Sequence, residues 1–97
     1  MAKLYVTEYG GIAAAGLPVA VAPPIVEQTP VVIGAGSLQS AAFDAATVLV
    51  RIHTDAICSI AFGTNPTASA NTARMAANAT EYFAVRFGQK VAVITNS

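Results

Sequence analysis

Charged side chains are scarce in this sequence, which has five Lys and Arg and five Asp and Glu among 97 residues. The five basic residues lie singly along the chain, whereas a nucleic-acid-binding domain usually gathers them into a patch or stripe. This scatter argues against nucleic acid as a partner. A domain of this length buries roughly two thirds of the surface of its unfolded chain, so the 55% of hydrophobic residues cannot all be internal. We therefore expect an uncharged surface that contacts other protein.

The residues that carry most enzyme chemistry are also few. The single cysteine, Cys58, excludes an intramolecular disulfide, and its apolar neighbours favour a small buried side chain over a reactive thiol. The single histidine, His53, is accompanied by no Gly-x-Ser-x-Gly elbow and no metal-ligand pair at a useful spacing. Gly34-Ala35-Gly36 begins like a dinucleotide fingerprint, but Gln39 occupies the position of its third glycine. We expect no catalytic site, no cofactor and no metal.

An apolar stretch at residues 12–22 ends in Ala20-Val21-Ala22, which resembles a signal-peptidase site. Glu8 precedes this stretch, and Gly16 and Pro18 interrupt it. The stretch is also shorter than the roughly 20 apolar residues of a membrane span. We therefore expect a soluble, unprocessed chain with no membrane partner.

The hydrophobic pattern predicts an all-β chain. In residues 47–54, Val48, Val50 and Ile52 alternate with more polar neighbours, as in a strand with one buried face. Dense Val, Ile and Thr with frequent Gly and Pro disfavour helix. Six to eight short strands with turns every 8 to 12 residues predict a small antiparallel β-sandwich or a jelly-roll-like barrel. The clearest expected strands are residues 3–9, 47–54, 57–62, 72–77, 81–87 and 90–95.

Residues 1–97 fit one domain, and residues 10–40 form an Ala/Gly/Pro-rich segment that is either an extended arm or an intrachain crossover. Within it we expect a flexible loop at residues 11–16 and edge strands near the four prolines, because proline cannot donate to a β-ladder. Asp55-Ala56 predicts a tight turn that joins residues 47–54 and 57–62 in a hairpin.

The aromatic residues divide between core and surface. Phe62 and Phe83 are expected to fill the core, and Tyr82, next to Phe83, must face the opposite side of its strand. Exposed aromatics of this kind could also form a platform for a sugar, although a core or interface role is the commoner one.

Residues 51–68 (RIHTDAICSIAFGTNPTA), 74–83 (RMAANATEYF) and 88–94 (GQKVAVI) resemble a pattern in small proteins encoded among tailed-bacteriophage structural genes. The resemblance covers about residues 41–95. It implies a virion structural protein, and most specifically a capsid decoration, or cement, protein. Such a protein is a small β-sandwich on the head surface that stabilises the shell by binding across capsid subunits.

That resemblance implies two partners, the major capsid protein and further copies of the chain in a cyclic homo-oligomer, with a trimer favoured. It also implies synthesis in the host cytoplasm and a final place on the capsid surface. Two alternatives remain open, namely a head–tail connector or tail component, and a carbohydrate- or receptor-binding β-sandwich. Candidate interface residues, from exposure and local composition, are Pro23, Pro24, Ile25, Arg51 and His53.

Overall fold

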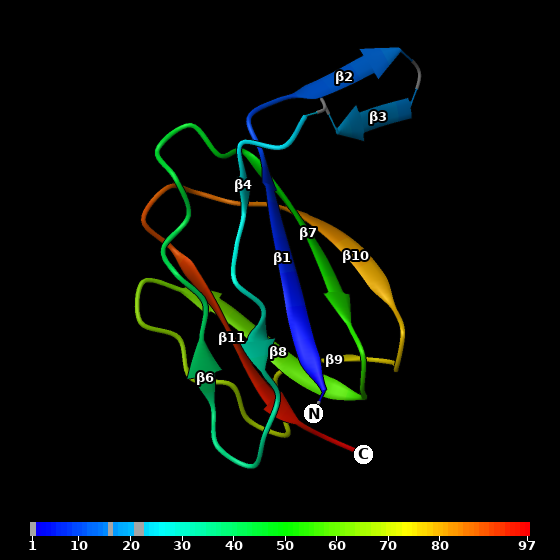
Figure 1. The fold of residues 1–97 in the computed structure, drawn as a ribbon, viewed down its shortest axis with the longest axis vertical. Helices are drawn as coiled ribbons and strands as arrows, with labels where there is room; N and C mark the ends of the chain where they lie inside the picture. The colour runs from blue at the N-terminus through cyan, green and yellow to red at the C-terminus, as the bar shows by residue number, and fades with distance from the viewer. Residues whose placement is uncertain (1, 16, 21–22) are drawn as a thin grey trace.

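The structure is a computed structural model that describes residues 2–15, 17–20 and 23–97. Two antiparallel sheets pack face to face, which confirms the predicted small β-sandwich (Figure 1). In the described part of the chain, no helix has the length and apolar character of a membrane span. The described strands are β1 (Lys3–Tyr9), β2 (Ile12–Ala15), β3 (Leu17–Ala20), β4 (Val26–Glu27), β5 (Val31–Val32), β6 (Leu38–Gln39), β7 (Leu49–Thr54), β8 (Cys58–Gly63), β9 (Ala73–Met75), β10 (Thr80–Ala84) and β11 (Lys90–Thr95).

The first sheet has the order β10-β7-β1-β4, and β5 also pairs with β1. Strand β1 takes the bounds that its alternating sequence predicts, with Leu4 and Val6 buried and Tyr5 exposed. Strands β4 and β5 lie at the edge, each two residues long, as their neighbouring prolines predict.

The second sheet has the order β6-β11-β8-β9. Strand β11 has the predicted bounds, and β9 places Met75 in the core and Arg74 in solvent, as the sequence indicates. Two turn residues have positive φ, Asn78 at 58° and Gly88 at 77°. Both are left-handed conformations that Asn and Gly adopt more easily than other residues.

The core lies between the sheets and is made of side chains from both. Phe62 contacts Phe43 and Phe83, with ring centroids 6.3 and 4.9 Å apart, and packs with Phe83 against the buried cluster, as predicted. The buried members of this cluster are Leu4, Val6, Val31, Ile33, Phe43, Val50, Ile52, Cys58, Ile60, Met75, Val91 and Val93.

The predicted hairpin through Asp55-Ala56 is wrong. Strand β7 pairs with β1 and β10, whereas β8 pairs with β9 and β11, so the bend between them carries the chain from one sheet to the other. Thr54 shapes this bend, because its hydroxyl donates to the carbonyl of Ala56 (2.6 Å) and accepts from the Ala56 N–H (3.3 Å). Val48, expected on the buried face, precedes the strand and is 43% exposed.

Residues 10–40 divide into two parts. Strands β2 and β3 pair only with each other and form a hairpin that extends beyond the end of the sandwich (Figure 1). The flexible loop expected at residues 11–16 is therefore wrong for residues 12–15, while residue 16 lies outside the described residues. Residues 23–40 return along the edge of the sandwich and supply β4, β5 and β6.

Candidate functional site

The outer face of the second sheet is covered by the chain itself. Ser59 and Ala92 alternate with core residues and should face outward, yet both are fully buried. The loop at residues 64–72 lies over them, held in part by Asn96, whose side-chain amide donates to Ser59 Oγ (2.6 Å) and to the Ala70 carbonyl (3.3 Å). Small side chains on this face leave room for the loop, so the second sheet has little outer surface left for a partner.

The outer face of the first sheet differs, because its side chains are exposed or half-buried. Register places its residues in three rows across the strands, because directly paired residues share a face. We call this surface the tyrosine face. Its members are Tyr5, Thr7 and Tyr9 of β1, Glu27 of β4, Leu49, Arg51 and His53 of β7, and Thr80, Tyr82 and Ala84 of β10.

One row of the tyrosine face is internally connected. His53 lies between Thr80 and Tyr5, with its Nδ1 2.8 Å from the Thr80 hydroxyl oxygen. The Tyr5 and His53 rings are 6.1 Å apart between centroids and tilted by 49°. Because these contacts restrict both rings before any partner arrives, a partner loses less side-chain entropy on binding here.

The middle row carries two charged residues. Arg51 lies between Tyr82 and Thr7, and Glu27 follows Thr7 at the edge. Tyr82 is 54% exposed. Tyrosine and arginine are the residue types that most often dominate binding energy at protein interfaces.

The structure places the five predicted interface residues as follows. Arg51 and His53 lie together on the tyrosine face, and both are half-buried. Ile25 is 44% exposed and lies at the border of this face. Its N–H donates to the carbonyl of Glu8 in β1, the residue that pairs with Val26. Pro23 and Pro24 precede it, on the way back from the hairpin.

Tyr5 and Tyr9 are not among the interface residues that the sequence predicts. The signal was available, since Leu4 and Val6 mark the buried side of β1 and the residues between them must point the other way. The sequence does not show which outer face of the sandwich is left uncovered by loops.

A second polar cluster surrounds the buried carboxylate of Glu8, which is 1% exposed. Glu8 Oε1 accepts from the Asp44 N–H (2.8 Å) and the Thr47 hydroxyl (2.6 Å), and Oε2 accepts from the Gln28 amide (2.8 Å). These donors occupy both oxygens and tie β1 to residues 41–47. The cluster is a structural network, because no face of the carboxylate is left for a substrate.

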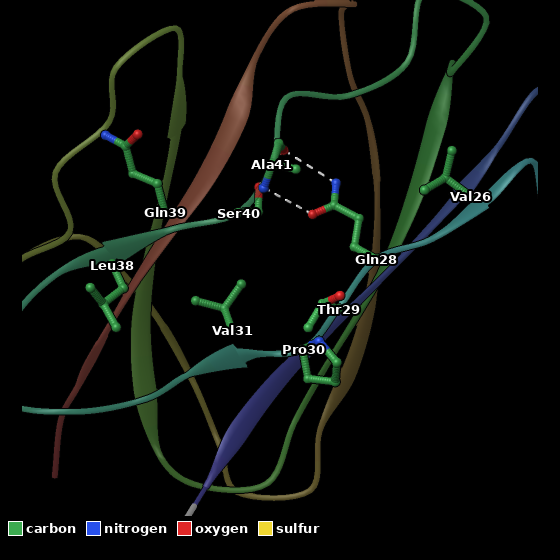
Figure 2. Close-up of a pocket in the computed structure, with 9 residues that line it drawn as sticks. All are labelled: Val26, Gln28, Thr29, Pro30, Val31, Leu38, Gln39, Ser40 and Ala41. Carbon is green, nitrogen blue, oxygen red and sulfur yellow. Dashed lines mark hydrogen bonds between the residues drawn. The ribbon is translucent and has the colours of Figure 1, made fainter.

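A groove runs along the seam between the edges of the two sheets (Figure 2). It holds about 410 Å³. It is lined by Val26, Gln28, Thr29, Pro30, Val31, Leu38, Gln39, Ser40 and Ala41. Every one of these residues is uncharged, so the groove suits an uncharged, apolar partner segment.

No cluster of metal-ligating residues occurs in the described ranges, where no three His, Cys, Asp or Glu residues lie in one group. Cys58 is fully buried, as predicted. Burial raises the pKa of its thiol, an effect partly offset by the hydrogen bond to Thr54 Oγ1 (3.4 Å). The thiol is therefore neutral and shielded at physiological pH.

We expect Cys58 to react with a thiol-specific dye at pH 8 only when the whole domain unfolds, so that native labelling is at least about 1,000-fold slower than labelling in urea. Because the pKa of Cys58 is raised in the folded state, the free energy of unfolding falls as pH rises. The loss begins at about 8.5, the pKa of cysteine in an unfolded chain, and continues up to the pKa in the folded protein. The labelling rate, measured as a function of pH, reports both the protection of the thiol and the loss of stability. The control is Ala77→Cys, on an exposed turn. Equal native rates at the two cysteines would contradict the prediction.

No family model matches this chain, and no curated protein or solved structure shows significant similarity to it.

Proposed function

We propose that the protein is a non-enzymatic structural component of a tailed-phage virion, a capsid decoration protein that binds across capsid subunits through its tyrosine face. The observation that carries the proposal is the asymmetry of the two sheets. One outer face is covered by the chain's own loop at residues 64–72, and the other presents three tyrosines, with Arg51, Glu27 and, at the end of β1, Lys3 as its charges. The resemblance of residues 41–95 to virion proteins supports the same function.

The area of the tyrosine face bounds how tightly one copy can bind. Three strands (β10, β7 and β1) spaced about 4.8 Å apart and about six residues long at about 3.3 Å each, with the short β4 at their edge, cover about 300 Å². A standard protein interface uses about 800 Å² on each partner. One face alone therefore supports a weak contact, and a decoration protein of this size needs either further surface or several linked copies to remain bound.

The proposed mechanism is mechanical. A protein that binds only the assembled shell adds its binding free energy to that state and opposes rupture. The effect grows with the number of filled sites, so many weak sites can stabilise a shell. Sparse charge suits this task, because charged side chains are depleted from the cores of permanent interfaces.

A carbohydrate-binding function is a second candidate, and a specific observation favours it. Tyr5 and Tyr82 are both more than a third exposed on one face of the sheet, and Arg51 of β7, the strand between β1 and β10, pairs directly with Tyr82. Aromatic rings flanked by hydrogen-bonding groups can stack on and orient a sugar. Glycan-array binding that is lost in Tyr82→Ala would support this function, and an array with no binding would reject it.

The experiment that tests the decoration function is a count of copies in purified virions by quantitative mass spectrometry, relative to the major capsid protein. We expect one copy per capsid subunit or a simple fraction of that ratio. A handful of copies per particle would instead point to the portal vertex or the tail. Absence from particles would reject the virion proposal.

A further inference from the structure

In the groove between the sheets, the side chain of Gln28 bonds to the main chain of Ala41 as a neighbouring strand would. The Gln28 side chain donates from Nε2 to the Ala41 carbonyl (3.2 Å), and its Oε1 accepts from the Ala41 N–H (3.0 Å), as Figure 2 shows. This paired donor and acceptor arrangement is the one that a neighbouring β-strand would offer to Ala41. The edge of the chain at residues 38–41 is therefore shaped to receive main-chain amides.

Gln39, two residues before Ala41, lies on the same edge, and among the described residues its main-chain groups have no hydrogen-bond partner on that side. The Ser40 N–H donates to the Val91 carbonyl (2.8 Å), so Ser40 directs its main chain toward β11. Adjacent residues of a strand direct their main-chain groups to opposite sides. The N–H and C=O of Gln39 consequently point away from β11, to the side where the groove lies.

The hairpin of β2 and β3 is the segment of this chain that needs such a site. Residues 12–20 read IAAAGLPVA and contain neither a charged nor a hydrogen-bonding side chain. In the described part of the chain its strands pair only with each other. A lone two-stranded hairpin is marginally stable in water.

We propose that the groove binds the β2–β3 hairpin of a second copy of this chain, with β2 adding to the free edge at Gln39. We take β2 as the strand that docks, because Pro18 in β3 lacks an N–H and so offers one donor fewer to a neighbouring strand. The match is chemical as well as geometric. An uncharged apolar segment enters an uncharged groove whose apolar lining includes Val26, Val31 and Leu38.

This contact is heterologous, since each copy gives a hairpin to one neighbour and a groove to another. Such contacts close into rings when the rotation between copies permits. The inference deepens the proposed function, because it names how decoration copies join. A hairpin folded into the groove of its own chain is the competing arrangement, although Figure 1 shows the hairpin beyond the end of the sandwich.

Sedimentation velocity of the full chain, without capsids, tests the proposal. We expect an oligomer for the native protein and a monomer for Leu38→Asp, because a carboxylate cannot be desolvated in the apolar groove without a partner. Ala14→Asp in β2 should have the same effect. Leu38 is 48% exposed, so the variant should keep the native circular dichroism spectrum and melting transition. The matched control is Tyr82→Asp on the tyrosine face, which should remain oligomeric.

A cross-link identifies which segment fills the groove. Ala14→Cys and Leu38→Cys proteins, mixed and oxidised, should form a disulfide between chains, while Cys58 stays buried and unreacted. A monomeric native protein would overturn the proposal, as would an oligomer that survives both aspartate substitutions. A disulfide confined to single chains of the double-cysteine variant would assign the groove to the chain's own hairpin. An oligomer absent from virions would reject only the decoration function, and a monomer that binds capsids would reject only the hairpin contact.

Discussion

Replacing Glu8 by Gln should lower the free energy of unfolding by about 2 to 4 kcal/mol, although the two side chains have nearly the same shape. The amide can still present an oxygen to the Thr47 hydroxyl and the Asp44 N–H. Its NH₂ must then face the NH₂ of Gln28. Gln28 cannot simply turn over, because its own amide is paired with both main-chain groups of Ala41.

The loss of charge adds to this steric and hydrogen-bonding conflict, since hydrogen bonds to an ionised acceptor are stronger than those to a neutral one. In a domain of this size each kcal/mol lowers the melting temperature by roughly 4 to 8 °C. Urea titration and thermal melts measure the effect. Glu27→Gln is the matched control, because it removes the same charge from an exposed position. This variant should change the free energy of unfolding by less than about 0.5 kcal/mol. Equal stabilities of the two variants would show that the Glu8 network does not hold residues 41–47 to β1.

The Glu8 network shows why a buried charge is harder to predict than a buried strand. Alternation in β1 places Glu8 on the same side as Leu4 and Val6, so its burial follows from the period of the strand. Its partners do not. Asp44 and Thr47 lie 36 and 39 residues away, and no local pattern connects them to β1.

The bend after β7 shows a second limit. The strands predicted at residues 47–54 and 57–62 correspond to β7 and β8, and their short connection favours a hairpin. A hairpin and a bend between sheets need the same local alternation, and the difference lies in which distant strands each one pairs with. Here β7 pairs with β1 and β10, and β8 pairs with β11. These partners are distant in sequence, so local patterns do not predict the pairing.

The tyrosine face shows a third limit. Strand periodicity identified Arg51 and His53 as outward-facing and Tyr82 as opposite to Phe83, and the structure confirms both assignments. Whether an outward face meets solvent depends on the loops. The loop at residues 64–72 covers one sheet because Ser59 and Ala92 are small, and nothing in its own sequence states which sheet it covers.

Replacing Tyr82 by Ala should weaken binding to capsids that lack this protein by at least about 30-fold per site, the loss expected when a tyrosine worth about 2 kcal/mol is truncated. The ring is 54% exposed and packs little against its own chain, so the variant should retain its fold. Co-sedimentation of purified chain with capsids over a concentration series measures the apparent affinity. Phe87→Ala is the matched control, because Phe87 is 71% exposed in the turn between the sheets, outside the tyrosine face.

The size of the loss also reports how many faces act together. In a monomer bound through one face, Tyr82→Ala lowers the affinity by the single-site factor. In a ring bound through several faces the single-site factors multiply, because each linked site contributes to the total binding free energy. Combining Tyr82→Ala with Leu38→Asp should therefore separate the two surfaces. In the monomeric Leu38→Asp background, Tyr82→Ala should cost only the single-site factor, and in the native background it should abolish measurable binding. Native affinity in Tyr82→Ala would reject the tyrosine face as the capsid-binding surface.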